Sequence, residues 1–228
     1  MSFAQVGLII SILALSASVH CAEESVFASE WFKERQATER KAMSHAGGRV
    51  NRKGNVLTIV TKTKKFRFRT DDDPALVKSW PISYRYAGFF SQVGYGYHLV
   101  SRVQYYEDGD YLFISDASSH IVVMPDEPHV SPSGKYIVSV LGGEVEGSEI
   151  VVWRIEGDRL LEQYRHKPKE YFIPTFKRWN GENEVDIAAD VYGQGQCKDQ
   201  IISLPYRVRQ SDSRWVLEPV KKEPECKQ

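Results

Sequence analysis

The chain has 228 residues, of which 42% are hydrophobic and 26% are charged, and its formal net charge at pH 7 is zero. This composition is that of a globular protein and excludes an intrinsically disordered chain. The lack of net positive charge argues, on global charge alone, against a general polyanion binder, and no nucleic-acid partner is expected. Aromatic residues make up 12% of the chain, with tyrosine the most frequent, which favours β-strands in one large domain.

The N-terminal segment, residues 1–21, carries no charged side chain and contains the apolar run VGLIISILAL. This pattern predicts a signal peptide, because the run is too short to span a bilayer and small residues follow it. Cleavage is conceivable after Ser18, Cys21 or Ala22. We therefore expect a periplasmic or secreted protein with no transmembrane helix after cleavage, or alternatively a buried first helix. A lipid anchor at Cys21 is not expected, because His20 is a poor fit immediately before an acylated cysteine.

Residues 22–48 are predicted to form an N-terminal helical segment, in which residues 25–46 make the one clear helix of the protein. Phe27 and Trp31 lie four positions apart and share a helix face, while the following positions are rich in charged helix formers. Gly47 and Gly48 are expected to end the helix, because glycine adopts the left-handed conformation needed past a helix end. Since the apolar stripe is short, we expect the helix to dock through its first two turns and to leave its charged second half in solvent.

From residue 49 onward the hydrophobic period changes from helical to alternating. This change predicts a β-rich domain over residues 49–219 and a charged tail over residues 220–228. Because crossover helices are missing, the pattern favours antiparallel meanders over βαβ units. Turns are expected at residues 62–63 and at residues 107–110, where Asp-Gly is a strong hairpin signal. The twelve predicted strands cover residues 55–61, 64–69, 82–90, 95–106, 111–115, 120–124, 136–141, 150–155, 159–164, 184–192, 200–209 and 214–217.

Three segments of the C-terminal half share a pattern: HVSPSGKYIV at 129–138, EIVVWRI at 149–155 and FKRWNGENEVDI at 176–187. They resemble blades of bacterial β-propellers of the Tol-associated and WD-repeat-like kind, in which a Ser-Pro-x-Gly-Lys turn precedes an inner strand. Gly134 and Gly181 lie 47 residues apart, close to a propeller period of roughly 40–50 residues. The resemblance implies blade-like antiparallel meanders in a partial or small propeller, an open curved sheet or a sandwich. The N-terminal half resembles exported bacterial proteins of uncharacterised function, a likeness that implies no activity.

Cys197 and Cys226 are the two cysteines outside the N-terminal segment. In an oxidising compartment such a pair usually bonds, so we predict a disulfide that staples the charged tail onto the body of the protein. The alternative is a pair of unbonded thiols. No C-x-x-C motif occurs, so neither a redox dithiol nor a zinc knuckle is expected.

Several segments partly match catalytic or ligand-binding motifs but are better explained as turns. His129 and Ser131 would share a strand face, as a catalytic base and nucleophile could. However, Ser-Pro-Ser-Gly is typical of a turn, and no G-x-S-x-G nucleophile elbow occurs. Residues 71–73 and 107–110 are acidic but lack the spaced pattern of a calcium loop. Residues 193–198 are glycine-rich, but no helical pattern follows to hold phosphates. The sequence therefore predicts no catalytic residue, no cofactor and no metal site.

Tyrosines recur at alternating positions, as at Tyr84 and Tyr86 and again at Tyr95 and Tyr97. In a strand, residues two apart point to the same sheet face, so these pairs would align their rings. Aromatic faces of this kind stack sugars or receive apolar side chains of a partner. We interpret the pairs mainly as internal packing, because tyrosine tolerates partial burial with its hydroxyl at the rim.

The charged residues are segregated along the chain. Residues 49–70 contain eight basic residues and no acidic one, whereas residues 105–158 contain eleven acidic residues against two basic ones. Between 65 and 69 the basic residues alternate with Phe66 and Phe68, which predicts one anchored face and one cationic face. The alternative is that the two charged regions lie in solvent or neutralise one another. The predicted partner-binding residues are Lys62, Lys64, Lys65, Arg67 and Arg69.

These features favour a non-catalytic exported protein whose β-sheet surface binds an anionic envelope component or a protein partner. The alternative is an envelope-polymer hydrolase that uses paired carboxylates, since glycosidase chemistry needs two such groups roughly 5–10 Å apart. A concave pocket with two close carboxylates would favour the enzyme. An exposed basic hairpin would favour the binding module.

Overall fold

The computed structural model describes residues 36–70, 82–92, 95–104, 108–143, 147–193, 197–198 and 200–220. Within these ranges one helix, at residues 36–44, precedes fifteen strands. The predicted class, mainly β with one N-terminal helix, is confirmed. The expected signal peptide, the first part of the expected helix and the charged tail beyond Val220 lie outside the described residues.

The strands form four antiparallel meanders, each built from strands that follow one another in the chain. Sheet 1 contains β1 (Val50–Lys53), β2 (Val56–Val60) and β3 (Lys65–Arg69). Sheet 2 contains β4 (Ile82–Gln92), β5 (Tyr95–Gln104), β6 (Asp108–Ser115) and β7 (Ile121–Met124). Sheet 3 contains β8 (His129–Val130), β9 (Tyr136–Leu141), β10 (Glu149–Glu156) and β11 (Arg159–His166). Sheet 4 contains β12 (Phe172–Trp179), β13 (Glu184–Tyr192), β14 (Ile201–Ser211) and β15 (Arg214–Pro219).

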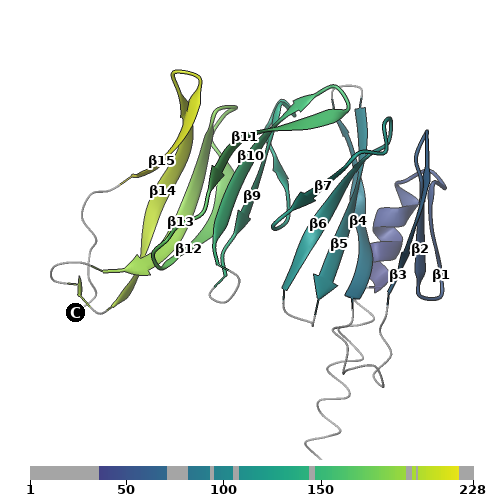
Figure 1. Ribbon diagram of the computed structural model, residues 1–228, viewed down its shortest axis with the longest axis horizontal. Helices are drawn as coiled ribbons and strands as arrows, with labels where there is room; N and C mark the ends of the chain where they lie inside the picture. The colour runs from purple at the N-terminus through teal and green to yellow at the C-terminus, as the bar shows by residue number, and fades with distance from the viewer. Residues whose placement is uncertain are drawn as a thin grey trace, which may run out of the picture.

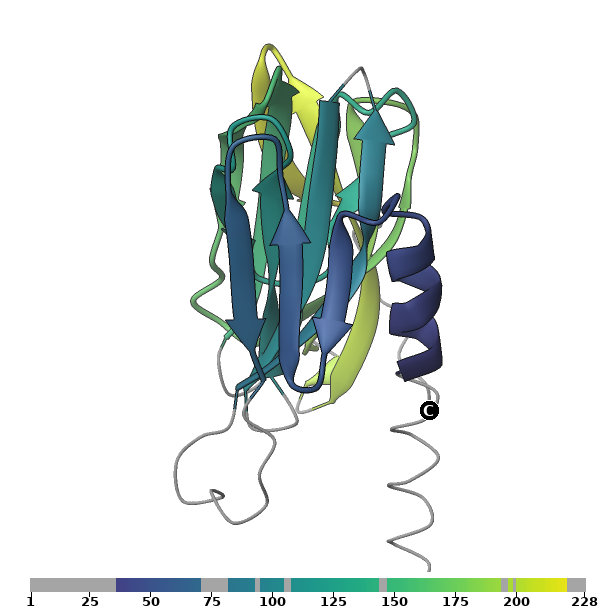
Figure 2. The ribbon, with the colours of Figure 1, turned by 90° about the vertical axis from the view of Figure 1, so that its right-hand side faces the viewer.

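The four sheets stand in a row, with sheet 1 and sheet 4 at opposite ends (Figure 1). Figure 2 looks onto the outer face of sheet 1, with the helix beside β1 and the other sheets behind. The described strands therefore form an open row of blade-like meanders. In such a row the two end sheets each keep one face that no further sheet covers.

Each space between neighbouring sheets holds a separate hydrophobic core, and burial of apolar surface there drives folding. The core between sheets 1 and 2 contains Ala46, Val50, Leu57, Ile59, Phe66, Tyr86, Val100, Leu112 and Ile114. The core between sheets 2 and 3 contains Tyr97, Leu99, Phe113, Met124, Ile137, Val151, Trp153 and Leu160. The core between sheets 3 and 4 contains Tyr136, Val138, Val140, Ile150, Val152, Val185, Ile187, Val208 and Trp215.

The position of a sheet in the row explains its hydrophobic pattern. Sheets 2 and 3 are covered on both faces, so β10 is a continuous apolar run in which Val151 faces one core and Val152 the other. Among the described residues, sheets 1 and 4 are covered on one face only. Their strands β3 and β13 therefore alternate between buried side chains and side chains that are exposed or half-buried.

All twelve predicted strands occur, and three strands, β1, β8 and β12, were not expected from the sequence. The strand β12 was missed because it contains Pro174 and two consecutive basic residues, which read as a loop. It forms the edge of sheet 4, where a residue without an N–H is tolerated because one side of the strand has no ladder to complete.

Of the two expected turns, one is confirmed and one is wrong. Thr61 N donates to Lys64 O at 2.9 Å, which closes the turn between β2 and β3. In contrast, Gly109 lies within β6 and pairs with Val103 instead of turning the chain. A Cβ at Gly109 would lie 2.7 Å from the carbonyl oxygen of Arg102, so glycine serves close strand contact at this position.

The helix docks differently from the expectation. Its charged second half does not lie wholly in solvent, because Glu39 is only 6% exposed and Ala42 and Met43 pack against the core between sheets 1 and 2. Past the helix, Gly47 and Gly48 have φ values of 60° and 78°, as predicted for glycines that end a helix. The helix takes the place beside β1 where a four-stranded sheet would have its fourth strand (Figure 2).

Candidate functional site

The outer face of sheet 1 carries a row of cations. In β3 the rings of Phe66 and Phe68 turn toward the core, while Lys65, Arg67 and Arg69 are exposed. Antiparallel register places Lys53 of β1 on the same face, because it pairs with Val56, which in turn pairs with Arg69. We call Lys53, Lys65, Arg67 and Arg69 the cationic face. The alternation of the sequence thus has the expected orientation.

The turn between β2 and β3 extends this charge at one end. Lys62 and Lys64 are both exposed there, and Lys64 Nζ lies 5.0 Å from the centroid of the Phe66 ring. Lys62 N donates to Asp116 O at 2.8 Å, which ties the turn to sheet 2. All five residues predicted to bind a partner are therefore exposed on the same end sheet.

The cationic face has no counter-charge among the described residues. No described carboxylate forms an ion pair with any of its four members, or with the two lysines of the turn. The other basic residues of this region are paired inward: Arg49 with Asp116 at 2.6 Å and Arg52 with Glu39 at 2.7 Å. Within the described residues, Arg49–Asp116 is the only ion pair between the basic region and the acidic middle of the chain.

The outer face of sheet 4, at the other end of the row, has a different charge pattern. Asp186 lies between two cations, 3.1 Å from Arg178 and 2.9 Å from Arg207. Arg209 forms a bidentate contact with Glu218 on the neighbouring strand. Sheet 4 therefore pairs Arg178, Arg207 and Arg209 with carboxylates of neighbouring strands, whereas no described carboxylate pairs with the cations of sheet 1.

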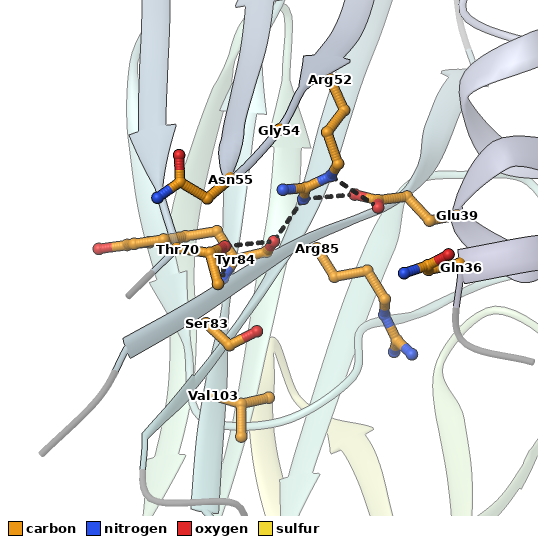
Figure 3. Close-up of a pocket in the computed structure, with 10 residues that line it drawn as sticks. All are labelled: Gln36, Glu39, Arg52, Gly54, Asn55, Thr70, Ser83, Tyr84, Arg85 and Val103. Atoms are coloured by element: carbon orange, nitrogen blue, oxygen red, sulfur yellow. Dashed lines mark hydrogen bonds and ion pairs between the residues drawn. The ribbon is translucent and has the colours of Figure 1, made fainter. Parts of the chain in front are cut away.

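A pocket of about 350 Å³ lies between the helix, sheet 1 and sheet 2 (Figure 3). Gly54 directly follows Lys53 and Thr70 directly follows Arg69, so the pocket lies near one end of sheet 1. The lining residues are Gln36, Glu39, Arg52, Gly54, Asn55, Thr70, Ser83, Tyr84, Arg85 and Val103.

Side chains that line the pocket form hydrogen bonds with the backbone of strand β4 at the edge of sheet 2. Strand β4 is an edge strand, and its outward backbone groups need partners other than a neighbouring strand. Glu39 accepts a hydrogen bond from Tyr86 N at 2.8 Å, and Arg52 Nη2 donates to Tyr84 O at 2.6 Å. Thr70 Oγ1 accepts from Tyr84 N at 3.0 Å and donates to Tyr84 O at 3.2 Å. Side chains from the helix and sheet 1 thus satisfy the β4 edge.

The charges lining the pocket leave donors unused. Both carboxylate oxygens of Glu39 accept bonds from Arg52, through Nε at 2.8 Å and Nη2 at 2.7 Å. Arg52 Nη1 and the whole guanidinium of Arg85 have no partner among the described residues. Two arginines against one carboxylate give the pocket a net charge of one positive unit, which favours an anionic occupant.

A buried polar chain that the sequence does not predict joins sheets 1 and 2 behind this region. Tyr86 Oη lies 3.0 Å from His98 Nδ1, and His98 Nε2 lies 3.5 Å from Asp116 Oδ1. Asp116 Oδ2 in turn accepts from Arg49 Nη1. Burial lowers the pKa of His98 and raises the pKa of Tyr86, because each charged form is poorly solvated there. No local motif marks these four residues, since they come from distant segments.

His129 and Ser131 do not form a base and nucleophile pair. Ser131 is 1% exposed, and its Oγ donates to Glu182 at 2.9 Å and accepts from Tyr136 N at 3.1 Å. The His129 ring stacks on Phe176 with centroids 3.7 Å apart. Both residues help to hold sheet 3 against sheet 4, which agrees with the turn interpretation of this motif. Gly134 has a φ of 77°, as that turn requires.

The alternating tyrosines are mostly packed inside. Tyr86 and Tyr97 are buried in different cores, and burial raises the pKa of Tyr97 to about 12. Tyr95 is partly exposed, whereas Tyr84 is half-buried and lines the pocket. The Tyr84 ring packs against Phe68 at the same core as Tyr86, so internal packing accounts for three of the four rings.

The remaining sequence candidates are only partly described. Residues 71–73 and Glu107 lie outside the described residues, and Asp110 pairs with Arg102. Within the described ranges no group of three or more His, Cys, Asp or Glu side chains could hold a metal ion. No helix in the described part of the chain is long and apolar enough to cross a membrane. Cys197 is buried, but Cys226 lies outside the described residues, so their disulfide stays a prediction.

No protein-family model, curated protein or solved structure matches the chain. The resemblance to β-propeller families therefore stays a prediction, while the blade-like meanders themselves are observed. Function has to be inferred from the charge and shape of the described surface.

Proposed function

We propose that this protein is an exported, non-catalytic binding module whose cationic face binds an anionic polymer of the cell envelope. The observation that carries the proposal is the row of outward cations that lacks a described carboxylate partner. End sheets of a stacked array need a polar outer face for solubility, but compensated charges serve that purpose, as on sheet 4. An uncompensated row raises the local concentration of anions and steers them to the surface.

The character of the face favours a polymer over an acidic protein. It presents no aromatic side chain, and its most exposed apolar residue is Val60, at 42%. Protein partners are usually held by buried aromatic and apolar anchors, which this face does not supply. Alternate residues of β3 place charges about 7 Å apart, a spacing that suits repeated charges along a chain.

The hydrolase alternative gains no support from the pocket beside the face. Glycosidase chemistry needs two carboxylates flanking the substrate. This pocket is lined by one carboxylate, Glu39, and Arg52 already holds both of its oxygens. The pocket is therefore better suited to bind an anion than to transfer a proton.

The test compares two triple variants with the same change in net charge. In the first, Lys65, Arg67 and Arg69 become Gln; in the control, exposed Arg159, Lys177 and Arg214 become Gln. Binding to polygalacturonate is measured by calorimetry from about 50 to 300 mM salt, a range over which screening of exposed charges grows strongly. We expect the first triple to weaken binding at least tenfold and to flatten its salt dependence, while the control stays close to wild type.

Circular dichroism should report equal structure for both triples, because Phe66 and Phe68 keep their burial. Equal loss of binding in the two triple variants would show that the net charge of the protein, and not the cationic face, determines binding. If the wild type binds neither polygalacturonate nor polyphosphate, the proposal is contradicted. Capture of an acidic protein instead would show that the cationic face binds a protein and not a polymer.

Export is tested separately. The apolar N-terminal run supports removal of the segment ending at Ser18, Cys21 or Ala22. Mass spectrometry of the native protein should show that loss and no acyl group on Cys21. An intact N-terminus would contradict export, and a lipid-modified Cys21 would contradict the soluble form.

A further inference from the structure

The outer face of sheet 4 exposes apolar side chains at one end. Ile187 of β13 points into the core, so Tyr192, five positions further along the strand, points outward. Tyr192 pairs with Ile201 of β14, and at 59% and 56% these are the most exposed large apolar residues in the described part of the chain. The Tyr171 ring extends the row, with its centroid 4.5 Å from that of the Tyr192 ring. Contiguous apolar side chains on an open face indicate an interaction site more strongly than isolated ones do.

A second apolar row crosses the same face four residues further along the strands. Ala188 pairs with Pro205, and Val220, which is 48% exposed, donates its backbone N–H to Pro205 O at 2.9 Å. Between the two apolar rows, Asp190 pairs with Ser203. One end of the outer face therefore presents two apolar rows that are separated by one polar row.

The charged residues of this face alternate in sign from strand to strand. Strand β12 presents cations, β13 carboxylates, β14 cations and β15 a carboxylate, apart from Arg214 at the hairpin end of β15. The residues of these stripes are Lys177 and Arg178 on β12, Glu184, Asp186 and Asp190 on β13, Arg207 and Arg209 on β14, and Glu218 on β15.

Stripes that alternate in this way are complementary to a second copy of the same face. A two-fold axis parallel to the strands, midway between β13 and β14, sets β13 of one copy against β14 of the other, and β12 against β15. Such an axis preserves the position along the strands. Arg178, Asp186, Arg207 and Glu218 lie in one row of the register. Arg178 of each copy therefore lies opposite Glu218 of the other, and Asp186 lies opposite Arg207, so that each contact joins opposite charges.

The rest of the face fits the same arrangement. Each apolar row lies opposite its own copy, Asp190 lies opposite Ser203, and among the described strands no carboxylate lies opposite another carboxylate. The cationic face of sheet 1 cannot pair with itself in this way, because cations would meet cations. The charge pattern therefore favours sheet 4, and not sheet 1, as the face that a second copy covers.

We propose that a second copy of this chain docks on the outer face of sheet 4, in a two-fold symmetric dimer that buries Tyr192 and Ile201. Sheet 1 stands at the opposite end of the row (Figure 1), so the dimer carries its two cationic faces at its far ends. Only the consequence of this geometry rests on the proposed function: two cationic faces hold one anionic polymer at two points, which raises the avidity without any new contact.

The first experiment measures the mass of the full chain in solution by sedimentation equilibrium, up to about 200 µM, because interfaces of standard size dissociate at micromolar concentrations or below. We expect twice the mass of one chain. Tyr192→Ser together with Ile201→Ser should raise the dissociation constant of the dimer at least tenfold. The control, Ile121→Ser together with Val123→Ser, removes exposed apolar side chains from the edge strand β7 and should leave the constant within twofold.

The second experiment tests the axis by exchanging charges. Arg178→Glu and Glu218→Arg each place like charges opposite one another in the dimer, so each variant alone should associate at least tenfold more weakly. In a mixed dimer the two substituted residues meet each other and the two native residues meet each other, so an equimolar mixture should regain the wild-type affinity. Circular dichroism checks the fold of both variants. If Glu218→Arg does not fold, Arg178→Glu serves alone, since the Arg178 side chain is 74% exposed.

The outcomes separate the dimer from the proposed function. A wild-type monomer, including one whose sheet 4 face is covered by another segment or another protein, would overturn the dimer, as would an unchanged dissociation constant without Tyr192 and Ile201 or no recovery in the mixture. Replacement of Lys65, Arg67 and Arg69 by Gln should leave the dimer intact. If the chain dimerises through sheet 4 but binds no anionic polymer, the dimer stands and the proposed function fails.

Discussion

The buried glutamate of the helix offers a direct test of how the fold holds its edge strand. Glu39 is 6% exposed and accepts two hydrogen bonds from Arg52 and one from the backbone N–H of Tyr86. Replacement by Ala removes all three bonds at once. The guanidinium of Arg52, whose side chain is 22% exposed, then loses its counter-charge, and the N–H of Tyr86 loses its partner.

The expected cost follows from these two losses. Breaking a buried ion pair by removing one partner costs about 3–5 kcal/mol, and an unsatisfied buried N–H costs about 1–3 kcal/mol. The two contributions overlap, and Arg52 retains some contact with water, so we expect a total of about 3 kcal/mol. Glu39→Gln keeps an acceptor for Tyr86 N and should cost about half as much.

Urea-induced unfolding followed by circular dichroism measures the loss, and hydrogen exchange at the Tyr86 amide reports the local opening. Lys41→Ala, on the exposed side of the same helix, should change stability by about 0.5 kcal/mol or less. The double variant of Glu39 and Arg52 to Ala should lose less than the sum of the single variants, because the unpaired cation is gone. A loss below about 1 kcal/mol for Glu39→Ala, or strict additivity, would refute a stabilising role for the pair.

Two further predictions concern protonation and the thiols. Burial holds the pKa of His98 below its usual 6.5, so just below that pH the unfolded chain binds a proton first and stability falls as the pH drops. The pKa values of His129 and His166 are lowered in the same way, and His98→Gln should flatten, without abolishing, the decline in urea midpoints between pH 7.5 and 5.5; an unchanged slope would count against His98. For the thiols, protein isolated without reductant should have Cys197 bonded to Cys226, and the bridge should contribute roughly 3 kcal/mol, so two alkylatable thiols in the folded protein would rule it out.

The sequence determined the strands because side-chain period and burial are coupled in a sheet. Phe66 and Phe68 alternate with three cations, and no other orientation of β3 buries the rings while keeping the charges in water. The double-sided burial of β10 is likewise visible in its continuous apolar run. The blade-like meanders follow from many such strands without crossover helices.

At two positions the local sequence was a poor guide to the strand. The strand β12 contains Pro174, which argues against a strand until it is known that the strand forms the border of sheet 4. Gly109 signals a hairpin turn in isolation, but it serves the close approach of β5 and β6. In both cases the deciding contact comes from a neighbouring strand.

The sequence by itself determined the class of the fold, the segregation of charge and the outward direction of Lys65, Arg67 and Arg69. Only the tertiary structure decided that sheet 1 stands at one end of the row and that a pocket lies between it, the helix and sheet 2 (Figures 1 and 3). It also decided that Glu39 is buried, because its partner, the N–H of Tyr86, lies 47 positions away on an edge strand. A charged residue on a short helix looks solvent-exposed unless the backbone group that it must satisfy is known.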